Sequence, residues 1–253
     1  KRVVVRQFAG LPQGACRDRM SLLVLGDSLT FHGPDAAHPP SDPRLWPNRL
    51  AAPATADVVA QIGWMSRDVW WSLTRDPKVW GECLPRADAL VIAVGGMDAL
   101  PAAIPTYLRQ GLSYIRPGTV RRRARSVYLS ASPKIISATG GPWRQLPQAA
   151  TDHYLTRVVQ GVRTFHPRLP IVAMTPPPHR ADLYPSQKFF ADSVRACHAW
   201  GGRNHVEIVD VTEVVLRGLR AGTHNADGMH FGWETHIAVA EKVRESLQRA
   251  SVP

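Results

Sequence analysis

The sequence has few cysteines and no hydrophobic run long enough to cross a membrane. Its three cysteines, Cys16, Cys83 and Cys197, lie far apart and form no Cys-x-x-Cys pair, so they indicate neither a disulfide framework nor a zinc site. The longest run of Leu and Val, residues 22–25, falls far short of the roughly 20 apolar residues that a membrane-spanning helix needs. Residues 1–10 are basic but lack the apolar centre of a secretion signal. We therefore expect a cytoplasmic protein without a membrane span.

Acidic side chains are scarce relative to basic ones. The chain has 31 Lys and Arg against 20 Asp and Glu, which gives a formal net charge of +11. Such a charge favours anionic partners, either macromolecules or small phosphorylated and carboxylated substrates, and it is equally typical of a solvated basic surface. Because aromatic side chains do not alternate with the basic ones, we expect no nucleic-acid partner.

Short apolar runs alternate with amphipathic stretches along the 253 residues. Buried strands are predicted at residues 21–25, 57–62, 87–94, 170–174 and 206–211. Helices are predicted at residues 154–165, 186–200 and 234–249, the second of them ending at Gly201 and Gly202. Strands that alternate with helices need crossover connections, and these produce a parallel sheet covered on both faces. The sequence therefore predicts one α/β domain with three layers, α/β/α, around a five-stranded parallel sheet.

One connection is too long for a single crossover helix. Residues 95–169 separate the third and fourth predicted strands, and residues 112–149 within them are rich in Pro and Gly. We expect these residues to form an insertion over one rim of the sheet, and residues 1–19 to form an N-terminal extension. The insertion carries the arginines Arg116, Arg121, Arg122, Arg123 and Arg125. These side chains form either a solvated surface or a lid that holds a phosphate or a carboxylate.

A serine directly follows the first predicted strand, in the motif Gly26-Asp27-Ser28-Leu29. Open α/β sheets bind their ligands at the carboxyl ends of the strands. A serine hydroxyl becomes a nucleophile when a histidine takes its proton and a carboxylate orients that histidine. The motif Asp227-Gly228-Met229-His230, in the loop before the last predicted helix, offers both groups. We therefore predict Ser28 as nucleophile, His230 as base and Asp227 as orienting acid.

Other histidines lie near these motifs. His32 follows Ser28, and His224 and His236 flank His230; we expect them at the surface or behind the catalytic groups. A metal site built from His224, Asp227 and His230 is disfavoured, because the spacing suits a triad better. We expect no metal.

The two motifs resemble those of the SGNH (GDSL) hydrolase superfamily, and the resemblance extends from about Met20 to the final helix. It implies a flavodoxin-like α/β/α fold. It also implies an oxyanion hole of backbone N–H groups from Ser28, from Gly63 after the second strand and from Gly96 after the third. Ser66 is an alternative to Gly63.

The third family block departs from its pattern. Where the family has Gly-x-Asn-Asp, this chain has Gly95-Gly96-Met97-Asp98. The family's asparagine side chain donates a hydrogen bond to the oxyanion, and methionine cannot donate one. Loss of such a donor typically lowers the rate by about 10²–10³. Either the oxyanion hole is made by backbone groups alone, or another side chain supplies the donor, or catalysis is impaired. The departure indicates a specialised member.

A closer resemblance points to acyl transfer. The whole chain is similar to actinobacterial SGNH proteins named diglucosylglycerate octanoyltransferases, and residues 95–118, with Gly-Gly-Met-Asp and Tyr-Ile-Arg-Pro-Gly, are typical of them. The resemblance implies transfer of an octanoyl group from acyl-CoA to a glucosylglycerate in mycobacterial methylglucose lipopolysaccharide synthesis, with no cofactor. Asp98, Arg121, Arg122 and Arg123 are candidate substrate-binding residues. The alternatives are an esterase or carbohydrate deacylase that uses water, and a non-catalytic domain that binds anions or glycans.

Overall fold

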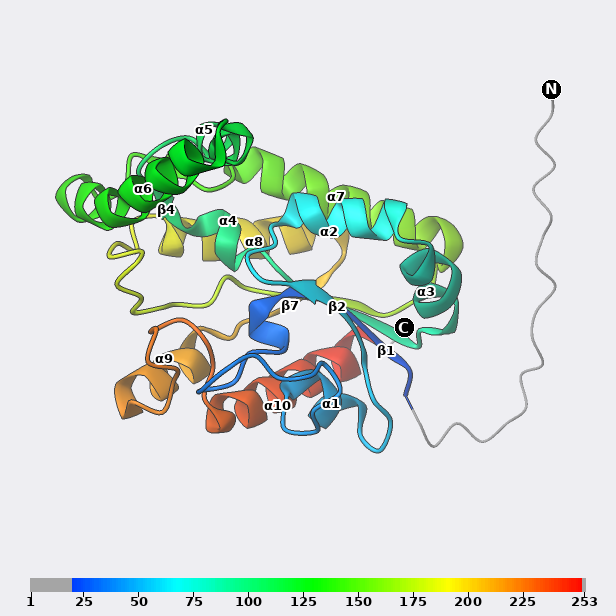
Figure 1. Ribbon diagram of the computed structural model, residues 1–253. Coiled ribbons are helices and arrows are strands. Elements are labelled where there is room, and N and C mark those ends of the chain that lie inside the picture. Colours follow the sequence, from blue (N-terminus) through cyan, green and yellow to red (C-terminus); the bar gives the residue numbers. More distant parts are fainter. Residues whose placement is uncertain (1–19, 252–253) are drawn as a thin grey trace, which may run out of the picture.

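The computed structural model describes residues 20–251 and has the three predicted layers (Figure 1). Its central sheet is parallel, with the strand order β2-β1-β3-β6-β7. The strands are β1 (Leu22–Asp27), β2 (Asp57–Gln61), β3 (Ala89–Ala93), β6 (Ile171–Met174) and β7 (Glu207–Val209). All five predicted strands are confirmed, with shifts of one or two residues at most ends. The predicted extension and Cys16 lie outside the described residues.

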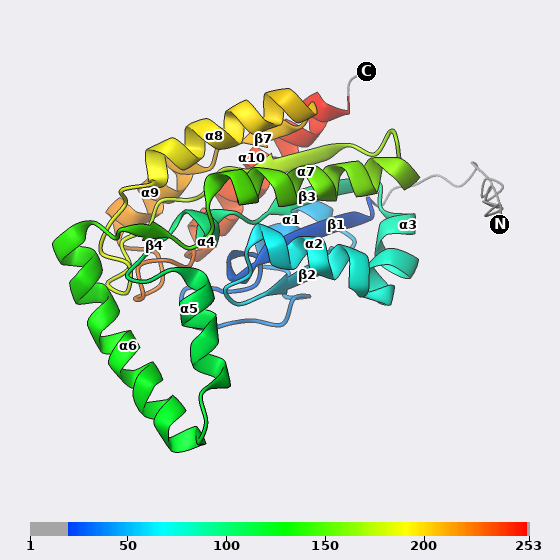
Figure 2. The ribbon, with the colours of Figure 1, turned by 90° about the horizontal axis from the view of Figure 1, so that it is seen from above.

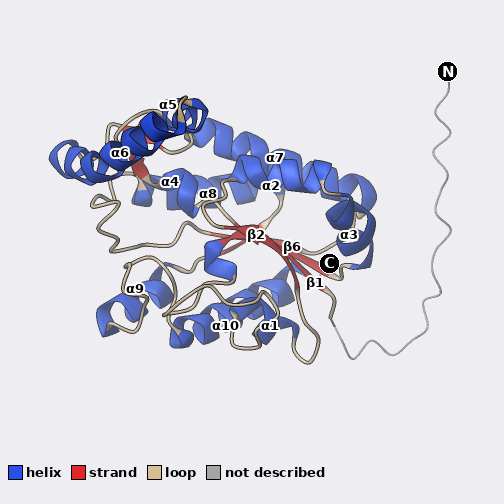
Figure 3. Ribbon diagram, in the orientation of Figure 1, coloured by secondary structure: helices blue, strands red, loops and turns tan. Residues whose placement is uncertain are grey.

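Helices cover both faces of the sheet (Figures 1 and 3). One face carries α2 (Ser66–Arg75), a π-helical turn η2 (Val79–Cys83), α3 (Leu84–Arg86), α7 (Gln148–Phe165) and α8 (Phe190–Asn204). The other carries α1 (Trp46–Ala51), α9 (Thr212–Ala221) and α10 (Trp233–Ala250). Within residues 20–251, no helix is both long and apolar enough to span a membrane.

The alternation of side chains along β1 divides the core into two parts. Leu22 and Val24 pack in the cluster that includes Val243 of α10, whereas Leu23 and Leu25 pack in the cluster that includes Val158 of α7. Successive side chains of a strand point to opposite faces, so a strand covered on both faces has an unbroken apolar sequence. This is why the strands could be recognised as short apolar runs.

The predicted end of α8 is wrong. The helix continues past Gly201 and Gly202 to Asn204, and His205 ends it with a left-handed backbone, φ 50°. Gly201 is needed for packing instead, since a Cβ there would lie 2.4 Å from Cγ1 of Ile208 on β7. Glycine at this position allows α8 to approach the sheet closely and does not terminate the helix.

The long connection after β3 is mostly helical. It contains α4 (Gly96–Ala99), β4 (Pro101–Ala102), α5 (Thr106–Gly111), a 3-10 turn η3 (Leu112–Tyr114), α6 (Gly118–Thr139) and β5 (Trp143–Arg144). The short strands β4 and β5 form a separate antiparallel pair. Figure 2 shows α5 and α6 extending from the body of the domain as two arms, which η3 and residues 115–117 connect. The predicted basic insertion, residues 112–149, thus contains the longest of these helices.

The strand register places three loops at one edge of the sheet. Gln61 of β2 pairs with Asp27 of β1, and Gly26 pairs with Ala93 of β3. The chain leaves all three parallel strands at this edge. Ser28, Gly63 and Gly96 follow these strand ends, which gives the candidate residues of three separate motifs a common location.

Candidate active site

Ser28 begins a single 3-10 turn, η1 (Ser28–Thr30), directly after β1. The Asp27 carboxylate caps this turn by accepting a hydrogen bond from the N–H of Leu29 at 3.0 Å. The hydroxyl of Thr30 donates to the carbonyl of Asp27 at 2.7 Å. These bonds fix the backbone on both sides of Ser28, which is itself only 5% exposed.

The structure brings the three predicted catalytic residues together. The Ser28 hydroxyl lies 2.9 Å from Nε2 of His230. On the other side of the ring, Nδ1 lies 2.5 Å from Oδ2 of Asp227. A carboxylate accepts hydrogen bonds only, so Nδ1 carries the ring proton and Nε2 is free to accept from Ser28. The arrangement has the contacts of a nucleophile, a base and an orienting acid.

The loop that carries Asp227 and His230 folds back on itself. Oδ1 of Asp227 accepts from the N–H groups of Met229 at 2.8 Å and His230 at 3.1 Å. Gly228 has φ 71°, and a Cβ there would lie 2.4 Å from the carbonyl oxygen of Arg180. The turn therefore requires glycine between the acid and the base.

Local interactions set the protonation of the pair. Burial lowers the pKa of His230 below its ordinary value, while the Asp227 carboxylate opposes that shift. Partial burial would by itself raise the pKa of Asp227, but hydrogen bonds from Met229 and His230 hold it below its ordinary value. At neutral pH His230 is therefore neutral and Asp227 is ionised, the states in which the pair can accept a proton from Ser28.

Asp98, a candidate substrate-binding residue in the sequence, lies in the interior of the protein and contacts two helices. It is fully buried, and its carboxylate accepts from the hydroxyl and N–H of Ser66 on α2 and from Oγ1 of Thr151 on α7, the last at 3.1 Å. Burial raises the pKa of Asp98. Burial also raises the pKa of Asp27 to about 7, with a contribution from the charge of Asp98. Asp98 thus joins α2, α4 and α7 behind the serine.

Both the hydroxyl and the N–H of Ser66 donate to Asp98, so neither group is available to an oxyanion. Gly63 lies in the turn between β2 and α2, and Gly96 begins α4. Met97 is the second residue of α4 and is partly exposed. Of the two candidates after β2, Gly63 is therefore the one whose N–H is not directed at Asp98.

Residues 24–237 match the GDSL-like lipase/acylhydrolase family. The matched range contains Ser28, Asp227 and His230. The chain belongs to this family. The structure agrees, because the most similar solved structures include a lipase/acylhydrolase from Enterococcus faecalis. That protein has a TM-score of 0.59 and 16% sequence identity, with 91% of this chain and 96% of that chain covered.

Two curated relatives match nearly the whole length of this GDSL-family chain. They are the proteins named diglucosylglycerate octanoyltransferase from Mycolicibacterium hassiacum, 39% identical, and from Mycobacterium tuberculosis, 37% identical. Each alignment covers 93% of this chain, and it covers 98% and 95% of the respective relatives. The protein is accordingly an acyltransferase enzyme of the GDSL family.

One feature of this GDSL-family site could not be deduced from its motifs. The ring of His32 stacks on the ring of His230, with centroids 3.8 Å apart and an interplanar angle of 20°. His32 stands four positions after Ser28, and this proximity was its only sequence signal. His224 makes no such contact. Within residues 20–251, no group of three His, Cys, Asp or Glu side chains is arranged to hold a metal ion.

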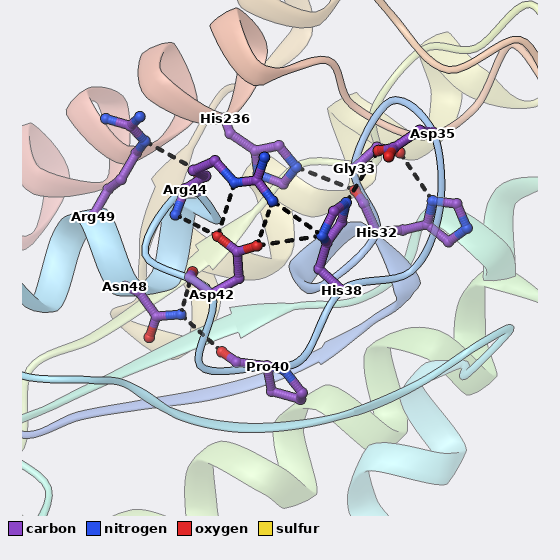
Figure 4. Close-up of polar contacts among 10 residues, drawn as sticks. All are labelled: His32, Gly33, Asp35, His38, Pro40, Asp42, Arg44, Asn48, Arg49 and His236. Atoms are coloured by element: carbon purple, nitrogen blue, oxygen red, sulfur yellow. Dashed lines mark hydrogen bonds and ion pairs between the residues drawn. The ribbon is translucent and has the colours of Figure 1, made fainter.

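A buried histidine holds His32 in place (Figure 4). The N–H of Trp46 donates to Nδ1 of His236 at 3.2 Å, so Nε2 carries the proton and donates to the carbonyl of His32 at 3.1 Å. Burial lowers the pKa of His236 to about 4, which keeps this ring neutral. His236 was expected at the surface or behind the catalytic groups, and it is fully buried behind them.

Side-chain hydrogen bonds also hold the rest of the loop between η1 and α1 (Figure 4). Nδ2 of Asn48 donates to the carbonyls of Pro40 and Asp42, each at 2.8 Å. The guanidinium of Arg44 donates to both carboxylate oxygens of Asp42, at 3.1 and 2.7 Å. These bonds give the loop a fixed course and therefore fix the plane in which His32 lies against His230.

We expect His32→Ala to move the acid limb of the kcat/KM profile to higher pH. The His32 ring covers one face of His230, so its removal admits water and weakens the burial that lowers the pKa of His230. A higher pKa leaves less neutral base at low pH. The measurement is hydrolysis of p-nitrophenyl octanoate against pH. His32→Phe keeps an aromatic cover and should shift the limb less; superimposable wild-type and alanine profiles would contradict this account.

Proposed function

We propose that this enzyme transfers an octanoyl group from its coenzyme A thioester to a hydroxyl of a glucosylglycerate-type acceptor. The observation that supports the acyl group and the acceptor most directly is the similarity to the two diglucosylglycerate octanoyltransferases over 93% of the chain. The triad contacts of Ser28 support an acyl-serine route. We place the reaction in methylglucose lipopolysaccharide synthesis, as the resemblance to these enzymes implies, and in the cytosol, as the sparse cysteines indicate.

In the first half of the reaction Ser28 attacks the thioester. As Oγ bonds to the carbonyl carbon, its proton passes to Nε2 of His230, 2.9 Å away, and Asp227 stabilises the resulting imidazolium. Collapse of the tetrahedral intermediate breaks the carbon–sulfur bond. The leaving thiolate takes the proton from His230, which leaves free coenzyme A and octanoyl-Ser28.

The second half repeats this chemistry with another nucleophile. A hydroxyl of the acceptor attacks octanoyl-Ser28 and gives its proton to His230. Collapse breaks the bond between the carbonyl carbon and Oγ, and His230 returns the proton to Ser28. Water could take the place of the sugar, and the triad alone does not distinguish transfer from hydrolysis, so acceptor binding must decide the product.

The oxyanion of both intermediates needs hydrogen-bond donors. We assign the backbone N–H groups of Ser28, Gly63 and Gly96, which follow the ends of β1, β2 and β3 at one sheet edge. Met97 adds no donor, and Ser66 is committed to Asp98. A thioester is more reactive than an oxygen ester, which makes a hole of backbone groups chemically adequate for the first half of the reaction; in the second half the same groups act on the oxygen ester octanoyl-Ser28.

The acyl-enzyme is expected to be visible by intact mass spectrometry. When the protein is mixed with octanoyl-CoA without acceptor and quenched in acid, it should gain the mass of one octanoyl group, and peptide mapping should place this group on Ser28. The acyl-enzyme accumulates because its breakdown awaits a sugar hydroxyl. Ser28→Ala is the control and should gain no mass. An octanoyl group found on another residue, or none under conditions where coenzyme A is released, would overturn the acyl-serine route.

A further inference from the structure

A basic cavity lies between the two arms that extend from the domain. It has a volume of about 670 Å³ and lies between α5 with η3, α6 and the loop that follows β6. Its basic side chains are Arg109 of α5 and Arg121, Arg122 and Arg125 of α6. Two tyrosines, Tyr128 and Tyr184, also line it. Figure 2 shows the two helices that form its sides.

The helical repeat selects which arginines face this cavity. Arg121, Arg125, Tyr128 and Ser132 follow one another at spacings of four, three and four, which places them on one face of α6. Arg123 is two positions from both Arg121 and Arg125, so it lies on the opposite face and does not line the cavity. Of the three arginines expected to bind substrate, Arg121 and Arg122 therefore line the cavity and Arg123 does not.

The charge of the cavity is not compensated by the protein. No Asp or Glu lines it, and within residues 20–251 no ion pair joins any of its four arginines to a carboxylate. Elsewhere on the surface, arginines are commonly paired, as Arg86 is with Asp57 and Arg203 with Asp152. Four guanidinium groups around one space without a counter-charge form a site for an anion that carries several charges.

The cavity is connected to the catalytic loop through a short segment. The N–H of Arg180 donates to the carbonyl of Gly228 at 2.7 Å, two residues before His230. Leu183 and Tyr184 line the cavity. Three residues of extended chain span at most about 10 Å, so Leu183 lies within that distance of the backbone of Arg180. The loop that lines the cavity is therefore hydrogen-bonded to the loop that carries His230.

We propose that this cavity binds the phosphate groups of the coenzyme A donor, an inference that rests on the proposed function. Guanidinium groups bind phosphate oxygens in pairs of parallel hydrogen bonds, and the donor carries a diphosphate and a further phosphate on its ribose. Tyr128 and Tyr184 offer aromatic faces to its adenine ring. The pantetheine arm then leads from the cavity toward the catalytic loop.

Calorimetric titration of the full chain with free coenzyme A tests this site. Arg122→Gln/Arg125→Gln should raise the Kd at least about tenfold, because charge-assisted hydrogen bonds to phosphate are lost. Arg125→Gln and Arg123→Gln form the matched pair: each removes one positive charge from α6, but only Arg125 lines the cavity, so Arg123→Gln, the control, should change the Kd less than about twofold. Glutamine has nearly the helix propensity of arginine, and equal melting curves confirm that α6 persists.

The outcomes separate this inference from the proposed function. If Arg123→Gln weakened coenzyme A binding as much as the cavity variants, the effect would be one of general charge and the cavity would not be the binding site. An unchanged Kd for coenzyme A in the double variant would also overturn the proposal. A double variant that keeps its Kd for coenzyme A but shows a raised KM for the acceptor assigns the cavity to the acceptor carboxylate instead. If the wild-type protein binds no coenzyme A but hydrolyses p-nitrophenyl octanoate through Ser28, the donor and the cavity are both wrong while the acyl-serine chemistry remains.

Discussion

Ser28→Ala is expected to lower the rate of octanoyl transfer by at least about a thousandfold, because no other group replaces the nucleophile that forms the covalent intermediate. The substitution removes one hydroxyl from a residue whose backbone is fixed by Asp27 and Thr30. The fold should therefore be unchanged, which circular dichroism and the melting temperature can check. The measurement is coenzyme A release from octanoyl-CoA with acceptor present. Activity above about a hundredth of wild type in a preparation free of other esterases would contradict the assignment.

The same prediction extends to the base. His230→Ala should be nearly as severe as Ser28→Ala, and the double variant should be no slower than either, since nucleophile and base act as a unit. His224→Ala is the matched control, because it removes a histidine six positions away whose Nδ1 is buried without a hydrogen-bond partner among the described residues. A larger loss with His224→Ala than with His230→Ala would show that the wrong histidine was assigned.

The layers of the fold could be predicted because its strands are buried on both faces. Such strands appear as short apolar runs, as β1 and β3 do, and the helical stretches between them imply parallel pairing. The end of α8 could not be predicted. Gly201 has the sequence signal of a helix end, but it serves close packing against Ile208, a contact between elements that the local sequence does not contain.

The helical character of the basic insertion was not predicted. The sequence predicted an insertion over the rim but left its secondary structure open, because Pro117, Gly118, Pro133 and Gly140 are spread along it. In the structure Pro117 and Gly140 flank α6, Gly118 begins it, and only Pro133 lies within it. Proline and glycine can mark either an irregular loop or the two ends of a helix. Here they mark the ends of one long helix, and the local sequence does not distinguish these two cases.

The contacts among Ser28, His230 and Asp227 could be predicted because each residue stands in a short motif whose chemistry is specific. The roles of their neighbours depend on contacts between distant parts of the chain. Asp98 is separated by 32 residues from Ser66 and by 53 from Thr151, yet these two hold its carboxylate. The stacking of His32 on His230 joins residues almost 200 positions apart. Only the fold shows that Asp98 is buried and that His32 covers the base.

The acceptor is expected to capture most of the acyl group despite the excess of water. A well-oriented hydroxyl can reach an effective molarity of about 10⁵ M or more, which exceeds the roughly 55 M concentration of water. The glycerate carboxylate gives a basic protein a charged group by which to orient the acceptor. His230 can take the proton of the acceptor hydroxyl as it takes that of Ser28. We therefore expect transfer to dominate and the acceptor to accelerate turnover.

The most direct test of acyl transfer is the partition of products in a single reaction. Octanoyl-CoA and the protein are incubated with and without a glucosylglycerate, coenzyme A release is followed, and the products are separated by mass, with Ser28→Ala as the blank. The account predicts that the acceptor accelerates coenzyme A release and that octanoylated glucosylglycerate exceeds free octanoate at least about tenfold, as positioning of the acceptor requires. Free octanoate as the main product, at a rate that the acceptor does not change, would show a hydrolase and contradict the account.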